Sequence, residues 1–202
     1  MYPFFETIRY INGTAENLHF HQDRVNNTLL QSGANKPVAL QQVIDACEHK
    51  PTCVDIVYKC RVKYDLTGRY DIGFELYTIK QIKSLSIVDI GNQSYTYKYS
   101  NRDWLNQLLK ATGTDEVLLM QNGLVKDATY ANLAFYNGLK WITPKEPLLY
   151  GTRRAQLIQN GIITEEIVTV EGLHRFTLVK PVNAMLTWEE APILNLNLID
   201  FK

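Results

Sequence analysis

Apolar and polar residues alternate in part along the first twenty positions, and the Asn12-Gly13 pair interrupts the pattern. Asparagine and glycine both tolerate a positive φ, so this dipeptide is typical of a tight hairpin turn. Two antiparallel strands are therefore predicted at the start of the chain, over residues 4–12 and 14–20.

The spacing of apolar residues changes after this hairpin. Val25, Leu29 and Leu30 recur at helical intervals, and Gly33 is a residue suited to a helix C-terminus. The pattern predicts a helix over residues 21–32. The other elements predicted in this half are a helix over residues 40–49 and strands over residues 53–64 and 70–79.

The second half contains two more Asn-Gly pairs, Asn122-Gly123 and Asn137-Gly138. Apolar segments flank both pairs, and two successive hairpins predict an antiparallel meander. The elements predicted here are strands over residues 116–121, 124–136 and 139–143, a helix over residues 153–159, and strands over residues 162–170 and 177–186.

Residues 80–86 contain few large apolar side chains and no helical pattern, so we place a domain boundary near residue 82. The predicted fold class is α+β, with antiparallel-rich sheets and flanking helices. It has two lobes, a small one over residues 1–82 and a larger one over residues 83–202.

The charge balance excludes some classes of partner. Lys and Arg together number 21, as do Asp and Glu, so no overall field favours nucleic acid or an anionic membrane. The chain starts without a signal-peptide pattern, and no segment approaches the roughly 20 apolar residues of a membrane-spanning helix. We expect a cytoplasmic protein that binds neither nucleic acid nor membranes.

Neither the cysteines nor the histidines form a metal-binding pattern. Cys47, Cys53 and Cys60 lack the paired spacing of a zinc site, and we expect reduced thiols. His19 and His21 would share one face of a strand, but no third ligand accompanies them. We expect no metal.

Lys98 lies between Tyr97 and Tyr99. Flanking aromatic rings would shield the amine from water, as a lysine that attacks an aldehyde requires, because only the neutral amine is nucleophilic. An exposed lysine beside aromatic residues is the alternative interpretation.

Several short segments around Lys98 share an order and spacing along nearly the whole chain. They are FETIR at residues 5–9, HQDRV at 21–25, YK at 97–98 followed by NR at 101–102, DEVLL at 115–119, ANLAF at 131–135, TP at 143–144, LLYGTR at 148–153 and NA at 183–184. Together they resemble the fold-type IV pyridoxal-phosphate enzymes, the class IV family of D-amino-acid and branched-chain aminotransferases and aminodeoxychorismate lyase.

The resemblance implies a D-amino-acid aminotransferase-like fold, the cofactor pyridoxal 5′-phosphate, and a homodimer. Lys98 would hold the cofactor as a Schiff base, and Arg24 would bind its phosphate. The other residues that the resemblance assigns to cofactor binding are Asp127, Ala131, Asn132, Gly151, Thr152, Asn183 and Ala184.

General chemistry supports the phosphate assignment. A phosphate is bound by a cation and by N–H donors, and a helix that begins after Gly151-Thr152 presents unsatisfied N–H groups to an anion. Thr152 as a simple helix cap is a compatible alternative. Arg9, Arg61 and Tyr64 are candidates to bind a substrate carboxylate, or are ordinary strand residues.

Two residues depart from the family pattern. Asp127 stands where the family has the glutamate that holds the pyridine nitrogen, and Ala131 replaces a serine. Asp127 retains the charge but has one methylene fewer.

Three functions follow from the resemblance. The first is an aminotransferase that acts on an amino acid or a related amine, in which Lys98 moves a proton. The second is an aminodeoxychorismate lyase, which forms 4-aminobenzoate and pyruvate. The third is a non-catalytic relative that binds pyridoxal phosphate.

Overall fold

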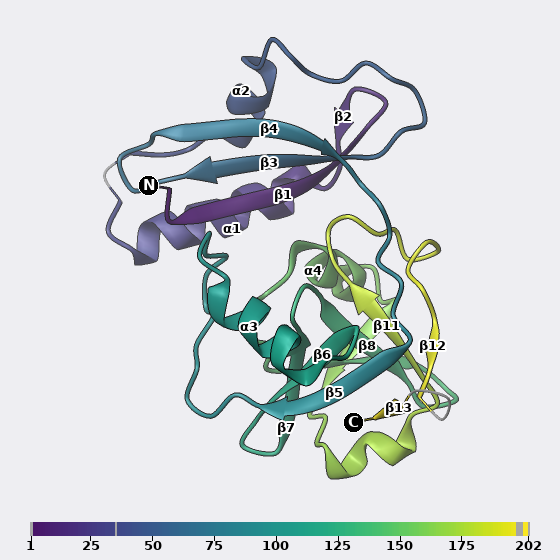
Figure 1. Ribbon diagram of the computed structural model, residues 1–202. Helices are drawn as coiled ribbons and strands as arrows, with labels where there is room; N and C mark the ends of the chain where they lie inside the picture. The colour runs from purple at the N-terminus through teal and green to yellow at the C-terminus, as the bar shows by residue number, and fades with distance from the viewer. Residues whose placement is uncertain (1, 35, 197–199, 202) are drawn as a thin grey trace. The chain divides into compact units, whose positions relative to one another are not determined.

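The computed structural model describes residues 2–34, 36–196 and 200–201, and the chain divides into two compact units (Figure 1). The first unit comprises Met1–Ile79 and Tyr97–Asn101, and the second comprises Lys80–Thr96 and Arg102–Lys202. Each combines helices with sheets, and most strand pairs of the chain are antiparallel. The predicted α+β class is confirmed.

The first unit contains one antiparallel sheet with the strand order β2-β1-β3-β4. Strand β1 pairs along its length with β3, so that Phe4 lies opposite Tyr64 and Ile8 opposite Cys60. The elements of this unit are β1 (Phe4–Ile11), β2 (Thr14–Ala15), α1 (Leu18–Gln31), α2 (Leu40–Asp45), β3 (Tyr58–Tyr64) and β4 (Tyr70–Leu76).

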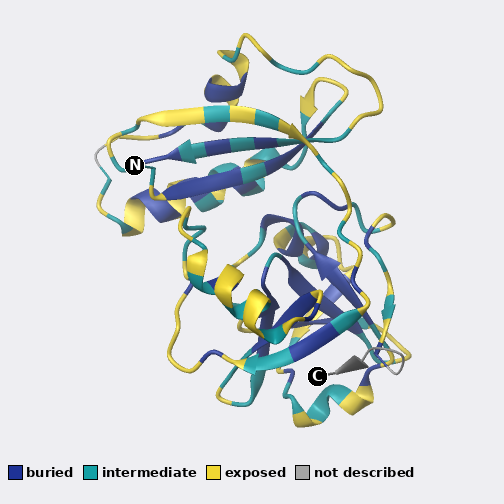
Figure 2. Ribbon diagram, in the orientation of Figure 1, coloured by how far each residue is buried: buried dark blue, intermediate teal, exposed yellow. Residues whose placement is uncertain are grey.

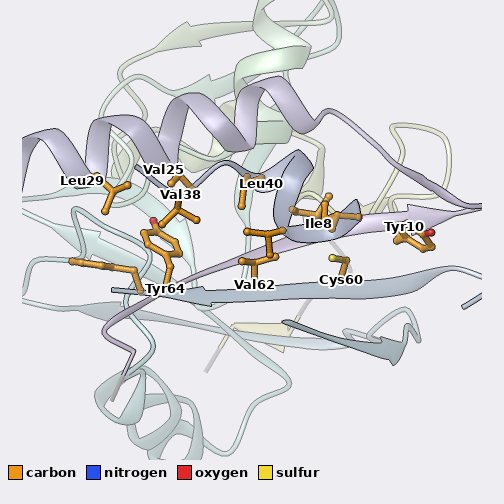
Figure 3. Close-up of a cluster of buried hydrophobic side chains, with 12 residues drawn as sticks. Ile8, Tyr10, Val25, Leu29, Val38, Leu40, Cys60, Val62 and Tyr64 are labelled. Atoms are coloured by element: carbon orange, nitrogen blue, oxygen red, sulfur yellow. The ribbon is translucent and has the colours of Figure 1, made fainter. Parts of the chain in front are cut away.

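The core of this unit lies between the helices and one face of the sheet, as Figure 3 shows. Successive side chains of a strand point to opposite faces, so the even-numbered residues of β1 share this face. Ile8 and Val62 are fully buried against Val25 of α1 and Leu40 of α2. Burial of each such side chain contributes roughly 1.5–3 kcal/mol.

Helix α1 begins earlier than predicted, and the strand predicted over residues 14–20 is reduced to Thr14–Ala15. Asn17 has a positive φ of 53°, which ends the extended backbone. Its carbonyl then accepts hydrogen bonds from the N–H groups of Phe20 and His21. The alternation of apolar and polar residues could not show this turn, because asparagine tolerates both an extended backbone and a positive φ.

The segment around Lys98 lies along the edge of β1. Strand β2 covers β1 only at Tyr10 and Ile11, which leaves the beginning of β1 open on that side. Tyr99 pairs there with Phe4, and the Phe5 N–H donates to the Lys98 carbonyl at 3.1 Å. Lys98 therefore belongs to the first unit, whereas the predicted division assigned it to the second lobe.

The second unit contains two sheets, with strand orders β13-β5-β6-β7 and β10-β9-β8-β11-β12. Figure 2 shows β6 and β8 as largely buried, and α3 with one exposed side. The elements are β5 (Ser84–Asp89), α3 (Asp103–Thr112), β6 (Glu116–Gln121), β7 (Leu124–Ala128), β8 (Asn132–Tyr136), β9 (Trp141–Pro144), α4 (Thr152–Gln159), β10 (Ile163–Glu166), the 3-10 helix η1 (Glu171–Arg175), β11 (Leu178–Val182), β12 (Leu194–Asn195) and β13 (Asp200–Phe201).

The strand predicted over residues 124–136 is two strands, and the two predicted hairpins belong to different sheets. The chain turns at residues 129–131, where the Ala128 N–H donates to the Ala131 carbonyl at 2.8 Å. Strand β7 pairs with β6, whereas β8 pairs with β9 and β11. The predicted single meander is therefore wrong, because the segment between the two strands has no glycine or proline to mark the turn.

Strand β5 and helix α3 are the two longest elements that were absent from the predicted set. Strand β5 pairs in parallel with β6, within the region assigned to the domain boundary. Helix α3 begins with Asp103 in its first turn and is followed by Gly113, whose φ is 64°. An acidic first turn and a C-terminal glycine are both helix signals, so the sequence contained the evidence for α3.

Candidate active site

Lys98 lies directly opposite Phe5 at the edge of β1. Side chains of directly opposed residues share one face of a sheet. The Lys98 Nζ accordingly lies over the Phe5 ring, 4.8 Å from its centroid, and the lysine is partly buried. The backbone of β1 thus determines where the amine is held.

The tyrosines beside Lys98 do not have the predicted role of covering its amine. Tyr97 and Tyr99 pack against the Phe4 ring, at centroid distances of 6.0 and 5.6 Å. Alternation along the segment directs them to the core face, away from the face shared by Lys98 and Phe5. Phe5 is therefore the aromatic neighbour of the amine, and sequence reasoning missed it.

Arg24 forms a buried network with Glu6 and His21. Its Nε donates to Oε1 of Glu6 at 2.9 Å and its Nη2 to Oε2 at 2.5 Å, while His21 Nδ1 lies 2.6 Å from the same Oε2. Glu6 is completely buried, and the Arg24 side chain is 12% exposed. The predicted phosphate ligand is thus already held by a carboxylate.

The network fixes the ionisation of its members. Burial would raise the pKa of Glu6, but the Arg24 charge and the hydrogen bonds of His21 and Arg24 lower it to about 2. Burial lowers the pKa of His21, against the opposing effect of Glu6. An ionised Glu6 only accepts hydrogen bonds, so neutral His21 donates through Nδ1.

The three candidate carboxylate ligands of the first unit differ in their surroundings. Arg9 is buried and lies 3.5 Å from Glu16. Arg61 also lies over the Phe5 ring, with its guanidinium carbon 5.5 Å from the ring centroid. Tyr64 is part of the apolar core, where burial raises its pKa. Arg61 is therefore the candidate that shares a neighbour with Lys98.

Asp127 and Asn132 form the centre of a second group, in the second unit. The Asn132 Nδ2 donates to Oδ1 of Asp127 at 2.6 Å and to the Leu149 carbonyl at 2.8 Å. The Leu149 N–H donates to the other Asp127 oxygen at 2.9 Å. We call Asp127, Asn132 and Leu149, with the adjoining Gly151, the carboxylate cluster.

Asp127 is a buried acid without a close basic partner. It is 4% exposed, and within the described ranges it forms no ion pair. Burial raises its pKa to about 6, although the N–H groups of Leu149 and Asn132 oppose the rise and the charge of Arg154 opposes it weakly. A buried carboxylate of this kind favours a cationic or N–H partner.

Helix α4 begins at Thr152 beside this cluster, with Gly151 as its N-cap. Gly151 has no side chain that could cap the helix, and the first N–H groups of a helix have no partner within the helix itself. Thr152 is buried, and Arg154, which sequence reasoning missed, is 4% exposed. Arg154 donates to the Pro144 carbonyl at 2.8 Å and to Glu165 at 2.6 Å.

The remaining predicted cofactor residues lie in turns. Ala131 is buried in the turn between β7 and β8. Asn183 and Ala184 follow β11, and the Asn183 Oδ1 accepts the N–H of Met185 at 2.9 Å. Ala131 lies next to the carboxylate cluster because it directly precedes Asn132 in the chain.

Glu116 supports the turn that carries Ala131. Its Oε1 accepts the Thr129 N–H at 2.9 Å and the Thr129 hydroxyl at 2.5 Å, and its Oε2 accepts the Lys80 ammonium at 2.7 Å. The Arg102 guanidinium donates to the Thr129 carbonyl. Both polar backbone groups of Thr129 are thus bound by charged side chains.

Comparisons with known proteins identify the family. The model of amino-transferase class IV matches residues 76–188, more than half of the chain. The chain belongs to the class IV aminotransferase family. A Haemophilus influenzae protein described as uncharacterized is 33% identical over 186 residues, which cover 92% of this chain and 98% of that protein.

Solved structures of class IV enzymes share the fold. A Haemophilus somnus protein with the provisional name 4-amino-4-deoxychorismate lyase is 31% identical, with a TM-score of 0.84 over 92% of this chain and 97% of that one. A hypothetical aminotransferase from Mycobacterium tuberculosis, solved with pyridoxal phosphate bound, is 15% identical, with a TM-score of 0.75 over 95% and 80% of the two chains. The predicted fold-type IV architecture is confirmed.

Residues 2–34, 36–196 and 200–201 include no helix long and apolar enough to cross a membrane. The same part of the chain contains no cluster of three or more His, Cys, Asp or Glu residues that could hold a metal ion.

Proposed function

We propose that this protein binds pyridoxal 5′-phosphate through Lys98 and acts as a class IV aminotransferase on an amino acid or a related amine. The main support for the proposal is the environment of the Asp127 carboxylate. A carboxylate that is 4% exposed, with both oxygens oriented by hydrogen bonds and no basic partner in the described ranges, is suited to a protonated ring nitrogen.

The start of α4 fits the phosphate. An anion at a helix N-terminus is stabilised by the unsatisfied N–H groups and by the helix dipole. The first turn of α4, with Gly151 before it and Thr152 within it, presents its backbone N–H groups at this end of the helix. Arg24, Asn183 and Ala184 complete the proposed cofactor-binding set, with Ala131 beside Asn132.

When bound, pyridoxal phosphate supplies an electron sink for the carbon that bears the substrate amine. Asp127 would hold a proton at the ring nitrogen, which keeps that sink effective. The glutamate of the family pattern would hold the same proton. Aspartate is compatible with this function because it retains the negative charge, although its side chain is shorter.

Lys98 has two roles in the proposal. Its neutral amine would hold the cofactor covalently at the aldehyde carbon, and a substrate amine would take its place. Lys98 would then be the general base, whose free amine accepts the proton of the amine-bearing carbon as an ammonium group. Phe5 limits where the amine can lie, since the Nζ is 4.8 Å from its ring centroid.

The second candidate function is an aminodeoxychorismate lyase. The observation that favours it is the 31% identity to the Haemophilus somnus protein of that provisional name. A Schizosaccharomyces pombe protein that carries a similar provisional name is 26% identical over 123 residues. Lys98 would remove the same proton, and pyruvate would then leave.

Absorbance spectra with substrates would separate these functions. An aminotransferase converts the bound cofactor to its amine form when an amino acid is added, and releases a keto acid. A lyase forms pyruvate and 4-aminobenzoate from aminodeoxychorismate, with the cofactor unchanged. Cofactor uptake without either reaction would indicate a non-catalytic relative, and no uptake would contradict the proposal.

We also propose that the protein is a homodimer, as the resemblance to class IV enzymes implies. Light scattering of the purified protein tests this directly. A mass of twice 23.3 kDa is expected, and a mass of 23.3 kDa at all concentrations would contradict it.

A further inference from the structure

Every hydrogen-bonding atom of the Asn132 amide has a neighbour inside the protein. Its nitrogen faces the Asp127 carboxylate and the Leu149 carbonyl, at 2.6 and 2.8 Å. Both are acceptors, so the two amide hydrogens point at them and the orientation of the amide is determined. Asn132 is 6% exposed, which leaves these hydrogens no other partner.

The amide oxygen lies against Gly151. A methyl group at residue 151 would be 2.0 Å from Oδ1 of Asn132 and 3.2 Å from its Cγ. No side chain fits at that distance. Gly151 has a φ of −74°, a conformation that any residue adopts, so the close approach of Asn132 is what requires glycine here.

We propose that Asn132 is a positioning residue that holds Asp127 and the start of α4 in a fixed arrangement, and that its side chain does not bind the cofactor. The proposal rests on the proposed function, in which Asp127 serves the ring nitrogen and α4 the phosphate. One amide group would then set the spacing between the two ends of the cofactor site.

The closed set of contacts explains how this works. Asn132 is bonded to Asp127 and to Leu149, and Leu149 is bonded to the other oxygen of Asp127. Rotation of the Asp127 carboxylate would break two hydrogen bonds. Gly151 follows Leu149 by two residues, so the same bonds fix the residue from which α4 begins.

A double-mutant cycle tests the proposal, with Asn132→Ala, Gly151→Ala, the double variant and the wild type. The dissociation constant of pyridoxal phosphate is measured by fluorescence, together with the pH dependence of the bound-cofactor absorbance. Asn137→Ala is the matched control, because Asn137 follows the same strand and its Oδ1 accepts only the N–H groups of Leu139 and Lys140 at 3.0 Å.

We expect Asn132→Ala to weaken cofactor binding about 10-fold or more, and to shift the pH profile of the absorbance, because a hydrogen bond to a charged group is lost. Gly151→Ala should be equally harmful alone but should add little to Asn132→Ala, since the clash is then removed. The control should bind as the wild type does.

The failures of the two proposals are distinguishable. A wild type that takes up no pyridoxal phosphate would contradict the proposed function. A wild type that binds it, with an Asn132→Ala variant of equal affinity and an unchanged pH profile, would contradict the positioning role alone. Independent, additive losses from Asn132→Ala and Gly151→Ala would also overturn it.

Discussion

Lys98 and Phe5 are paired across the edge of β1, with the Phe5 N–H bonded to the Lys98 carbonyl at 3.1 Å and the Lys98 Nζ 4.8 Å from the Phe5 ring. The pairing gives the amine a fixed neighbour in place of bulk water. A cation over an aromatic ring gains about 0.5–1 kcal/mol at a partly exposed site.

Phe5→Leu should therefore speed the attachment of pyridoxal phosphate to Lys98 by roughly 2- to 5-fold, because the ring stabilises the ammonium form by that energy and only the neutral amine attacks the aldehyde. Stopped-flow absorbance measures the rate. Phe74→Leu is the control, because Phe74 packs against Tyr10 on the core side of the same sheet. An unchanged or slower rate in Phe5→Leu, or an equal increase in Phe74→Leu, would remove Phe5 from the site.

Removal of Arg24 should destabilise the first unit. Arg24→Ala leaves the buried Glu6 carboxylate without its cation, and loss of one partner from a buried pair costs about 3–5 kcal/mol. Urea unfolding of the cofactor-free protein measures this. Lys63→Ala, which breaks the exposed pair with Asp71, should cost at most about 1 kcal/mol. Equal losses in both variants would contradict the account.

The same network predicts the response to acid. The pKa of His21 is lowered in the folded protein, so its contribution to stability is present above its unfolded value of 6.5 and is lost as the pH falls below it. Glu6 contributes stability above its model value of 4.5, which is lost as the pH falls towards about 2. The midpoint temperature of thermal unfolding should therefore depend less on pH in His21→Gln than in the wild type, between pH 6.5 and 4.5.

The pH dependence that Asp127 gives to the stability should have the opposite sign to that of Glu6 and His21. Its folded pKa of about 6 lies above its model value of 3.8, so stability is full below 3.8 and falls as the pH rises through 6. Compared with Asp127→Asn, the cofactor-free wild type should lose about 2–3 kcal/mol of unfolding free energy between pH 3.8 and pH 7. A difference between the two proteins that does not change with pH would contradict this ionisation.

Glu116 should stabilise the turn at residues 129–131. Glu116→Gln exchanges one acceptor for a donor beside Thr129 and Lys80, and should cost about 1–3 kcal/mol of unfolding free energy. Hydrogen exchange of the Thr129 amide should accelerate as well. Glu146→Gln, whose side chain pairs with Lys126 and is 59% exposed, serves as the control.

The sequence predicted the fold class, the family and the Asn-Gly turns, because each depends on short segments. It did not predict the turn at residue 129, where the segment contains neither a glycine nor a proline. Nor did it predict that the Lys98 segment joins the first unit, since this depends on the open edge of β1, a tertiary feature. Arg154 and Phe5 were missed for the same reason.

Of the candidate residues, Arg24 illustrates what spacing cannot show. Its place in the sequence resembles a phosphate-binding arginine, whereas its bonds to Glu6 depend on a strand that lies eighteen residues earlier. Asp127 is the converse case. Its substitution for glutamate is visible in the sequence, but only the structure shows that both of its oxygens are already oriented.

Covalent attachment of the cofactor to Lys98 is the central claim, and reductive trapping tests it most directly. The protein is incubated with pyridoxal phosphate, reduced with borohydride and digested, and the modified peptide is identified by mass spectrometry. Lys180 is the internal comparison, because it is a buried lysine that donates to the Trp188 carbonyl at 2.7 Å and lies outside the proposed site. We expect modification of Lys98 and its loss in Lys98→Ala; modification at another lysine, with Lys98 unmodified, would contradict the account.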